Sequence, residues 1–204
     1  MALIANGLSG QAMRQGEVNL ASMRKSIDEG NEAILTTSST CTFTMRDEYK
    51  DLLKIENGDV RSHIMLATRF LCQLVDEGKI KLAFRKGYHK KVAYHTACHM
   101  ERMGWAVYSI RLMQMVPGLG LTVLESQCCG IAGTYGFKKE NYERSQKIGA
   151  PLFKQIKEVD PDCVSTDCET CKWQIEMSTG YPVENPISLI ADALDVEKTK
   201  ALNA

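Results

Sequence analysis

Three short apolar segments in the second half of the sequence are each followed, within a few residues, by cysteine. The pairings are 91–95 with Cys98, 119–124 with Cys128 and Cys129, and 162–166 with Cys168 and Cys171. Helical patterns cover residues 101–115, 138–159 and 186–194. Strands that alternate with helices predict an α/β fold with mostly parallel strands.

The five cysteines are expected to meet at one edge of this sheet, because the carboxyl ends of parallel strands lie together and usually bind ligands there. A structural zinc ion takes four ligands, often from two close pairs, and only Cys168 and Cys171 form such a pair. The adjacent Cys128 and Cys129 suit a polynuclear cluster, in which each sulfur reaches a different iron. We interpret the set as an iron–sulfur site, with a zinc site or buried apolar thiols as the alternatives.

The residues around the cysteines favour a bound anionic cluster. Asp167 is expected to cap the helix that follows the last strand, so that free backbone N–H groups point toward the thiolates. Gly130, Gly133 and Gly136 follow the cysteine pair and permit a close approach of the backbone.

Other cysteines and histidines have weaker claims to the site. Cys41, Cys72 and Cys163 are expected to be packing thiols, although Cys163 is an alternative extra ligand. His95 and His99 flank one of the five cysteines. Each is either a hydrogen-bond donor to the cluster or an ordinary histidine near a strand end, and the sequence leaves both alternatives open.

The first half of the chain predicts a smaller set of elements. They are a helix over 8–29, a strand over 32–37, a helix over 43–53 and a long helix over 60–75. This half also repeats the second, since Gly7 matches Gly136 and Thr37 matches Thr166 at the same offset. The counterpart of the cysteine pair would then precede Met1. We therefore expect the chain to be the C-terminal piece of a longer protein.

Four regions follow from this organisation. We predict a truncated first lobe with a connecting helix over residues 1–77, a basic linker over 78–91, a complete lobe over 92–195 and a charged, frayed tail over 196–204. The fold is therefore expected to contain two repeated α/β lobes, of which the first is truncated at its N-terminus.

Composition limits the function classes. The 25 basic and 25 acidic residues balance, which gives no electrostatic support for a nucleic-acid partner. No signal peptide or apolar run of about 20 residues is visible, so we expect a reducing compartment and, at most, peripheral membrane association. Neither G-x-G-x-x-G nor a Walker A loop is present, so any flavin or nucleotide that oxidises a substrate is expected on partner subunits.

The cysteine spacing resembles that of the CCG, or cysteine-rich, domain family. The likeness rests on the stretches Tyr94–Met100, Ser126–Glu140 and Thr166–Met177, with weaker similarity at 5–8 and 37–43. The family includes the B subunit of heterodisulfide reductase, subunits of lactate and glycolate oxidation, and the electron-transfer subunits of anaerobic glycerol-3-phosphate dehydrogenases. The likeness is strongest to this last group.

The resemblance implies specific roles. Cys98, Cys128, Cys129, Cys168 and Cys171 would bind a cluster of the 4Fe–4S or non-cubane type. The chain would pass electrons from flavin-containing glycerol-3-phosphate dehydrogenase subunits toward menaquinone, at the cytoplasmic face of the inner membrane. The ferredoxin-like cysteine runs of this group are absent from the 204 residues, and of the motif cysteines the first lobe keeps only Cys41. The alternatives are a thiol/disulfide oxidoreductase like heterodisulfide reductase, and a zinc-bound or metal-free docking module.

Overall fold

The chain forms two compact units in a computed structural model that describes residues 2–204. The first unit ends at Ala67, and the second comprises Thr68–Ala204. Each unit contains one sheet of parallel strands together with helices. The predicted α/β fold with parallel strands is therefore confirmed.

The first unit holds a two-stranded sheet. Its elements are α1 (Ala2–Ala5), α2 (Ser9–Asp28), β1 (Ile34–Thr36), α3 (Ser39–Phe43), the π-helical η1 (Thr44–Glu48), α4 (Tyr49–Asp51), α5 (Gly58–Arg61) and β2 (Ile64–Leu66). Leu20 and Met23 of α2 pack with Val60 and Ile64 in its core. Because α2 presents apolar residues at helical spacing, it buries one side of the helix against α5 and β2.

The prediction of one long helix over 60–75 is wrong, because Ile64–Leu66 forms strand β2, which pairs in parallel with β1. Ile64 and Leu66 are both fully buried, so the apolar run that resembles a helix stripe is a core strand. Helix α6 (Ala67–Asp76) begins only after it.

A four-stranded parallel sheet organises the second unit, in the order β4-β3-β5-β6. Its elements after α6 are β3 (Lys90–Tyr94), α7 (Cys98–Met103), α8 (Ala106–Gln114), β4 (Leu119–Val123), η2 (Tyr135–Phe137), η3 (Lys139–Asn141), α9 (Tyr142–Val159), β5 (Cys163–Ser165), α10 (Glu169–Thr179), β6 (Val183–Glu184), α11 (Pro186–Ala193) and α12 (Val196–Asn203). Strand β3 lies between β4 and β5, so the loops after these three strands are neighbours.

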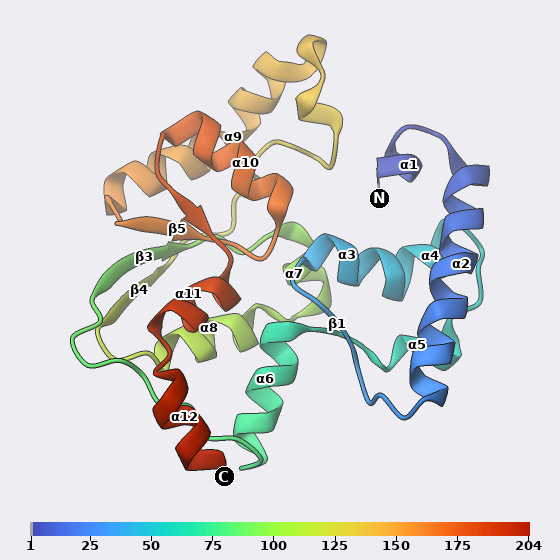
Figure 1. Cartoon of the computed structure of the whole chain (residues 1–204). Helices are drawn as coiled ribbons and strands as arrows, with labels where there is room; N and C mark the ends of the chain where they lie inside the picture. Colours follow the sequence, from blue (N-terminus) through green and yellow to red (C-terminus); the bar gives the residue numbers. More distant parts are fainter. Residues whose placement is uncertain (1) are drawn as a thin grey trace. The chain divides into compact units, whose positions relative to one another are not determined.

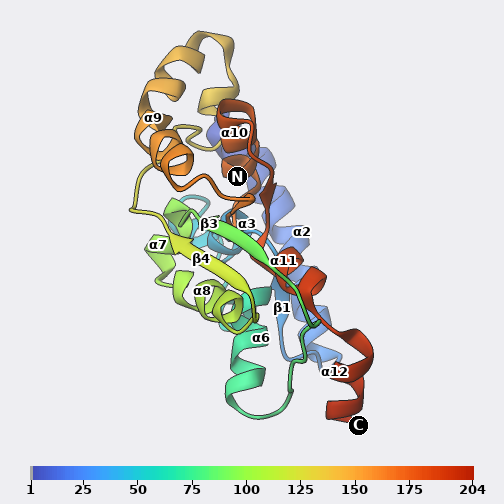
Figure 2. The ribbon, with the colours of Figure 1, turned by 90° about the vertical axis from the view of Figure 1, so that its left-hand side faces the viewer.

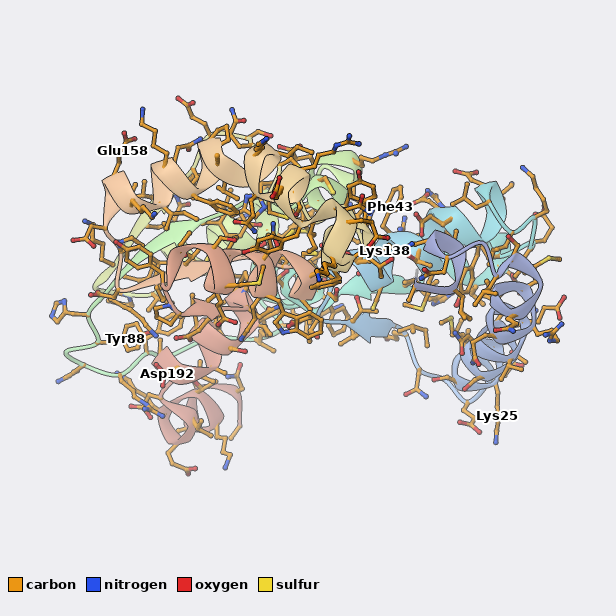
Figure 3. All side chains as sticks on the ribbon, turned by 90° about the horizontal axis from the view of Figure 1, so that it is seen from above. Lys25, Phe43, Tyr88, Lys138, Glu158 and Asp192 are labelled. Atoms are coloured by element: carbon orange, nitrogen blue, oxygen red, sulfur yellow. The ribbon has the colours of Figure 1, made fainter. Side chains whose placement is uncertain are left out.

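Helices cover both faces of this sheet. Helices α9 and α10 lie on one face, and α8 and α11 lie on the other (Figures 1 and 2). Val92 and Tyr94 of β3 pack with Met113 of α8 and Leu189 of α11 on the second face. Lys138 and Glu158 lie near the two ends of α9 (Figure 3). The inner strands β3 and β5 are buried, as expected for parallel strands with helices on both faces, whereas the edge strand β4 stays partly exposed.

Two sequence-based expectations for the second unit are wrong. The helix expected over 101–115 is two helices, because Gly104 adopts a left-handed φ of 68° between α7 and α8. Residues 196–203 form α12 in place of a frayed tail. Asn203 and Thr199 anchor that helix through hydrogen bonds with the backbone of Lys81 and Ala83. Because these hydrogen bonds join residues 122 and 116 positions apart, the local sequence of the last residues does not predict this helix.

Candidate metal centre

The loops after β3, β4 and β5 bring the five cysteines to one edge of the sheet. Cys98 is the first residue of α7, and Cys128 and Cys129 lie in the loop after β4. Cys168 is the N-cap of α10, and Cys171 lies in the first turn of that helix. The predicted convergence of these residues is what the structure shows, whereas their role as ligands stays a prediction.

The sulfur atoms surround one small cavity. Cys129 Sγ and Cys171 Sγ lie 3.3 Å apart. A cavity of about 80 Å³ is lined by His95, Thr96, Cys98, Glu101, Ser126, Gln127, Cys128, Cys129 and Cys171. Cys168 completes the group, since its thiol interacts electrostatically with Cys98 and Cys171. Cys129, Cys168 and Cys171 are buried, while Cys98 and Cys128 are exposed, so the site has a buried side and a side that faces solvent.

Gly130 fixes the path of the cysteine pair. Its φ is 88°, and a Cβ at this position would lie 2.1 Å from the carbonyl oxygen of Ser145 in α9. Ser145 Oγ donates to the Gly130 oxygen at 2.9 Å and accepts from Gln174 Nε2 at 2.8 Å. The Gly130 N–H in turn lies 3.3 Å from Cys128 Sγ. A glycine is therefore required here, both for the backbone conformation and for the contact.

Hydrogen bonds stabilise a thiolate at Cys129. Donors at Cys128, Cys171 and His95 hold the pKa of the Cys129 thiol below its ordinary value, against the opposing effect of burial. The same interactions raise the pKa of Cys128 and of Cys171, because each gives its proton to the shared contact. Burial, followed by the neighbouring thiols, raises the pKa of Cys98. Of the cysteines with a shifted pKa at this site, Cys129 therefore favours the thiolate, and Cys98, Cys128 and Cys171 favour the thiol.

The expected capping role of Asp167 is wrong. The N-cap of α10 is Cys168, which makes no side-chain capping hydrogen bond. The Asp167 carboxylate accepts from Tyr94 Oη at 2.6 Å and from Ser109 Oγ at 2.9 Å, and Ser109 Oγ lies 2.9 Å from Thr68 Oγ1. Burial raises the pKa of Asp167 to about 6, although both hydrogen bonds oppose this rise. The network ties the start of the Cys168 loop to β3 and α8.

The remaining cysteines lie elsewhere. Cys41 is exposed in the first unit, Cys72 is buried with residues of α8 and α11, and Cys163 is buried in the sheet. Neither Cys163 nor His99 is among the residues that line the cavity, whereas His95 is.

Several cavity residues were not anticipated from the sequence. Thr96, Glu101, Ser126 and Gln127 line the cavity, and Ser126 Oγ donates to Glu101 Oε1. Thr96, Ser126 and Gln127 lie in the stretches that resemble the CCG family, whereas Glu101 lies outside them.

The donor set fits an iron–sulfur cluster. Four of the five thiols line one cavity, and the fifth, Cys168, interacts with Cys98 and Cys171. The backbone N–H groups of Gly130 and Ile131 point at sulfur atoms. Thiolate ligands with N–H···S hydrogen bonds are typical of such clusters. The N-terminal end of α10, with its free N–H groups, adds partial positive charge near the buried thiols.

None of the helices among residues 2–204 is both long and apolar enough to span a membrane.

Comparisons with known proteins agree with the cysteine site. The CCG family, described as a cysteine-rich domain, matches residues 92–176. The C subunit of anaerobic glycerol-3-phosphate dehydrogenase from Escherichia coli K12 is 56% identical over 192 residues, which are 94% of this chain and 48% of that protein. The chain thus spans about half the length of this curated relative.

More distant relatives include two from methanogens. The B subunit of fumarate reductase (CoM/CoB) from Methanothermobacter marburgensis is 27% identical over 74% of this chain and 29% of that protein. The D subunit of dihydromethanophenazine:CoB–CoM heterodisulfide reductase from Methanosarcina barkeri is 23% identical over 89% of this chain and 48% of that protein. All five converging cysteines lie within the range that the family matches. Residues 92–176 are therefore a cysteine-rich domain of the CCG family.

Proposed function

We propose that this chain is an electron-transfer subunit that carries an iron–sulfur cluster on Cys98, Cys128, Cys129, Cys168 and Cys171. The observation that supports this most strongly is that four of the five thiols line one cavity and Cys168 interacts with two of these four, while two of the five are exposed. When bound, such a cluster supplies a one-electron carrier. The exposed Cys98 and Cys128 would place one side of it within reach of a partner protein, while the buried thiols would limit access by water.

The partners are inferred from the relative. Because the C subunit of an anaerobic glycerol-3-phosphate dehydrogenase is 56% identical, we propose that flavin-containing subunits of such an enzyme supply the electrons. Menaquinone at the cytoplasmic face of the inner membrane would receive them, through a peripheral contact. Residues 1–77 and 92–195 would be the truncated and complete lobes, joined by residues 78–91.

A reduction assay tests this role. The chain is purified anaerobically and mixed with the flavin-containing subunits, glycerol 3-phosphate and a soluble menaquinone analogue. We expect the visible absorption of the cluster to bleach only when partner and substrate are both present. Quinone reduction by the flavin subunits alone, at the same rate as with this chain, would contradict an electron-transfer role.

One contact favours a second candidate, a thiol/disulfide oxidoreductase. Cys129 Sγ and Cys171 Sγ are 3.3 Å apart, and Cys129 favours the thiolate form that attacks disulfides. Mass spectrometry of the metal-free protein after mild oxidation distinguishes the two. A Cys129–Cys171 disulfide that dithiol substrates reduce catalytically would support this candidate, and a protein that is active only with iron bound would exclude it.

A further inference from the structure

The imidazole of His95 is buried beside the cysteine sulfurs and takes no part in the proposed ligand set. His95 directly follows β3, is 2% exposed, and lines the cavity. Its backbone N–H donates to the carbonyl oxygen of Ser165 at 2.8 Å, which continues the pairing of β3 with β5 by one residue. The sheet itself therefore holds this ring at the centre of the three cysteine loops.

The ring nitrogens of His95 have different surroundings. Potential ligand atoms of His95, Cys129 and Cys171 all lie within 4.8 Å of one another, and the imidazole helps to hold the pKa of the Cys129 thiol below its ordinary value. Nδ1 is buried without a hydrogen-bond partner among residues 2–204. Nε2 is therefore the nitrogen that faces the sulfur. A neutral imidazole that donates from Nε2 carries its single proton there.

These contacts differ from those of a structural histidine and from those of a metal ligand. A buried histidine in a protein core normally has polar partners for both nitrogens. A histidine that binds a metal normally donates its other N–H to a carboxylate, a carbonyl or water. The buried carboxylate near this site, Asp167, accepts from Tyr94 and Ser109 instead. No carboxylate or carbonyl among residues 2–204 meets Nδ1, which favours a donor role toward Cys129 over a ligand role.

We propose that His95 is a positioning residue of the cluster site, which donates a hydrogen bond from Nε2 to the Cys129 sulfur and raises the reduction potential of the bound cluster. The inference rests on the proposed function, because it requires Cys129 to bind the cluster. Hydrogen bonds to sulfur are among the factors that set such potentials. The donor withdraws negative charge from the thiolate, so it stabilises the reduced and more negative state over the oxidised one.

Two substitutions of one residue test the role. His95→Phe keeps a planar ring but removes the donor, whereas His95→Gln keeps an N–H donor. His89, which is exposed in the loop before β3, provides the matched control as His89→Phe. Each protein is purified anaerobically, its iron and acid-labile sulfide are measured, and its midpoint potential is determined by titration followed by visible absorption and EPR. Far-UV circular dichroism checks the fold.

We expect His95→Phe to hold the cluster at a more negative midpoint potential, His95→Gln to lie between it and the parent, and His89→Phe to match the parent. Loss of iron from His95→Phe with retention in His95→Gln would also support a donor role. A midpoint potential of His95→Phe equal to that of the parent would overturn the donor role. Loss of iron from both folded His95 variants would also overturn it, because that result indicates that His95 is an iron ligand. If the parent protein contains neither iron nor sulfide, the proposed function itself is overturned. This result differs from that of cluster-containing His95 variants whose midpoint potential equals that of the parent, which would overturn only the role of His95.

Discussion

The backbone of Gly130 passes so close to α9 that any side chain would meet the carbonyl oxygen of Ser145. Substitution with alanine would place a Cβ 2.1 Å from that oxygen and strain a φ of 88°. We expect Gly130→Ala to displace the cysteine pair, to lower the iron content well below that of the parent, and to reduce the free energy of unfolding by about 1–3 kcal/mol. Iron assay and urea denaturation measure the two effects.

Gly133 is the matched control for this substitution. Its φ is also left-handed, at 68°, but a Cβ there would meet no atom within 4 Å. Gly133→Ala should therefore cost only the backbone strain, about 1 kcal/mol, and keep the iron content of the parent. Equal iron loss in both variants would show that the contact with Ser145 does not position the cysteines.

At the scale of elements, one buried carboxylate joins β3, α8 and the loop that leads to α10. Tyr94→Phe removes the Oη donor from Asp167 and leaves that oxygen without a compensating hydrogen bond. We expect the free energy of unfolding to fall by about 1–3 kcal/mol, because Asp167 is fully buried. Denaturation in urea, followed by circular dichroism, measures this change.

Tyr181 offers a comparable hydrogen bond at the surface. Its Oη donates to Asp160 Oδ1 at 2.6 Å in an exposed position. Tyr181→Phe should cost well under 1 kcal/mol, because water can replace the lost partner. If Tyr94→Phe proved no more destabilising than Tyr181→Phe, the buried network would not join these elements as described.

The sequence predicts a strand where an apolar segment is followed by cysteine, and it also predicts that the cysteines after such strands lie together. Strands β3, β4 and β5 and the convergence of the cysteines could be predicted in this way. Strand β2 runs directly into α6, so its apolar residues read as part of one helical pattern, and β6 has only two residues. Asp167 carries the local pattern of a helix cap, and only tertiary contacts with Tyr94 and Ser109 decide otherwise. A similar limit applies to His95, whose two roles differ only in three-dimensional geometry.

For the whole molecule, the division into two units places the complete site in one of them. Every residue that lines the cavity belongs to the second unit, as do all four strands of its sheet. We therefore expect residues 68–204, expressed alone, to bind as much iron per chain as the full chain does. Iron assay and circular dichroism on the purified segment measure this. A folded segment without iron would show that the first unit contributes to the site.

The iron and acid-labile sulfide content of the anaerobically purified full chain tests the central claim most directly, with zinc measured in the same samples. Two variants accompany it: Cys171→Ser, which removes a buried sulfur of the site, and Cys41→Ser, which removes an exposed sulfur of the first unit. We expect a coloured protein that contains iron and sulfide, loss of both from Cys171→Ser, and no change in Cys41→Ser. A colourless protein with stoichiometric zinc, or a full cluster signal in Cys171→Ser, would contradict it.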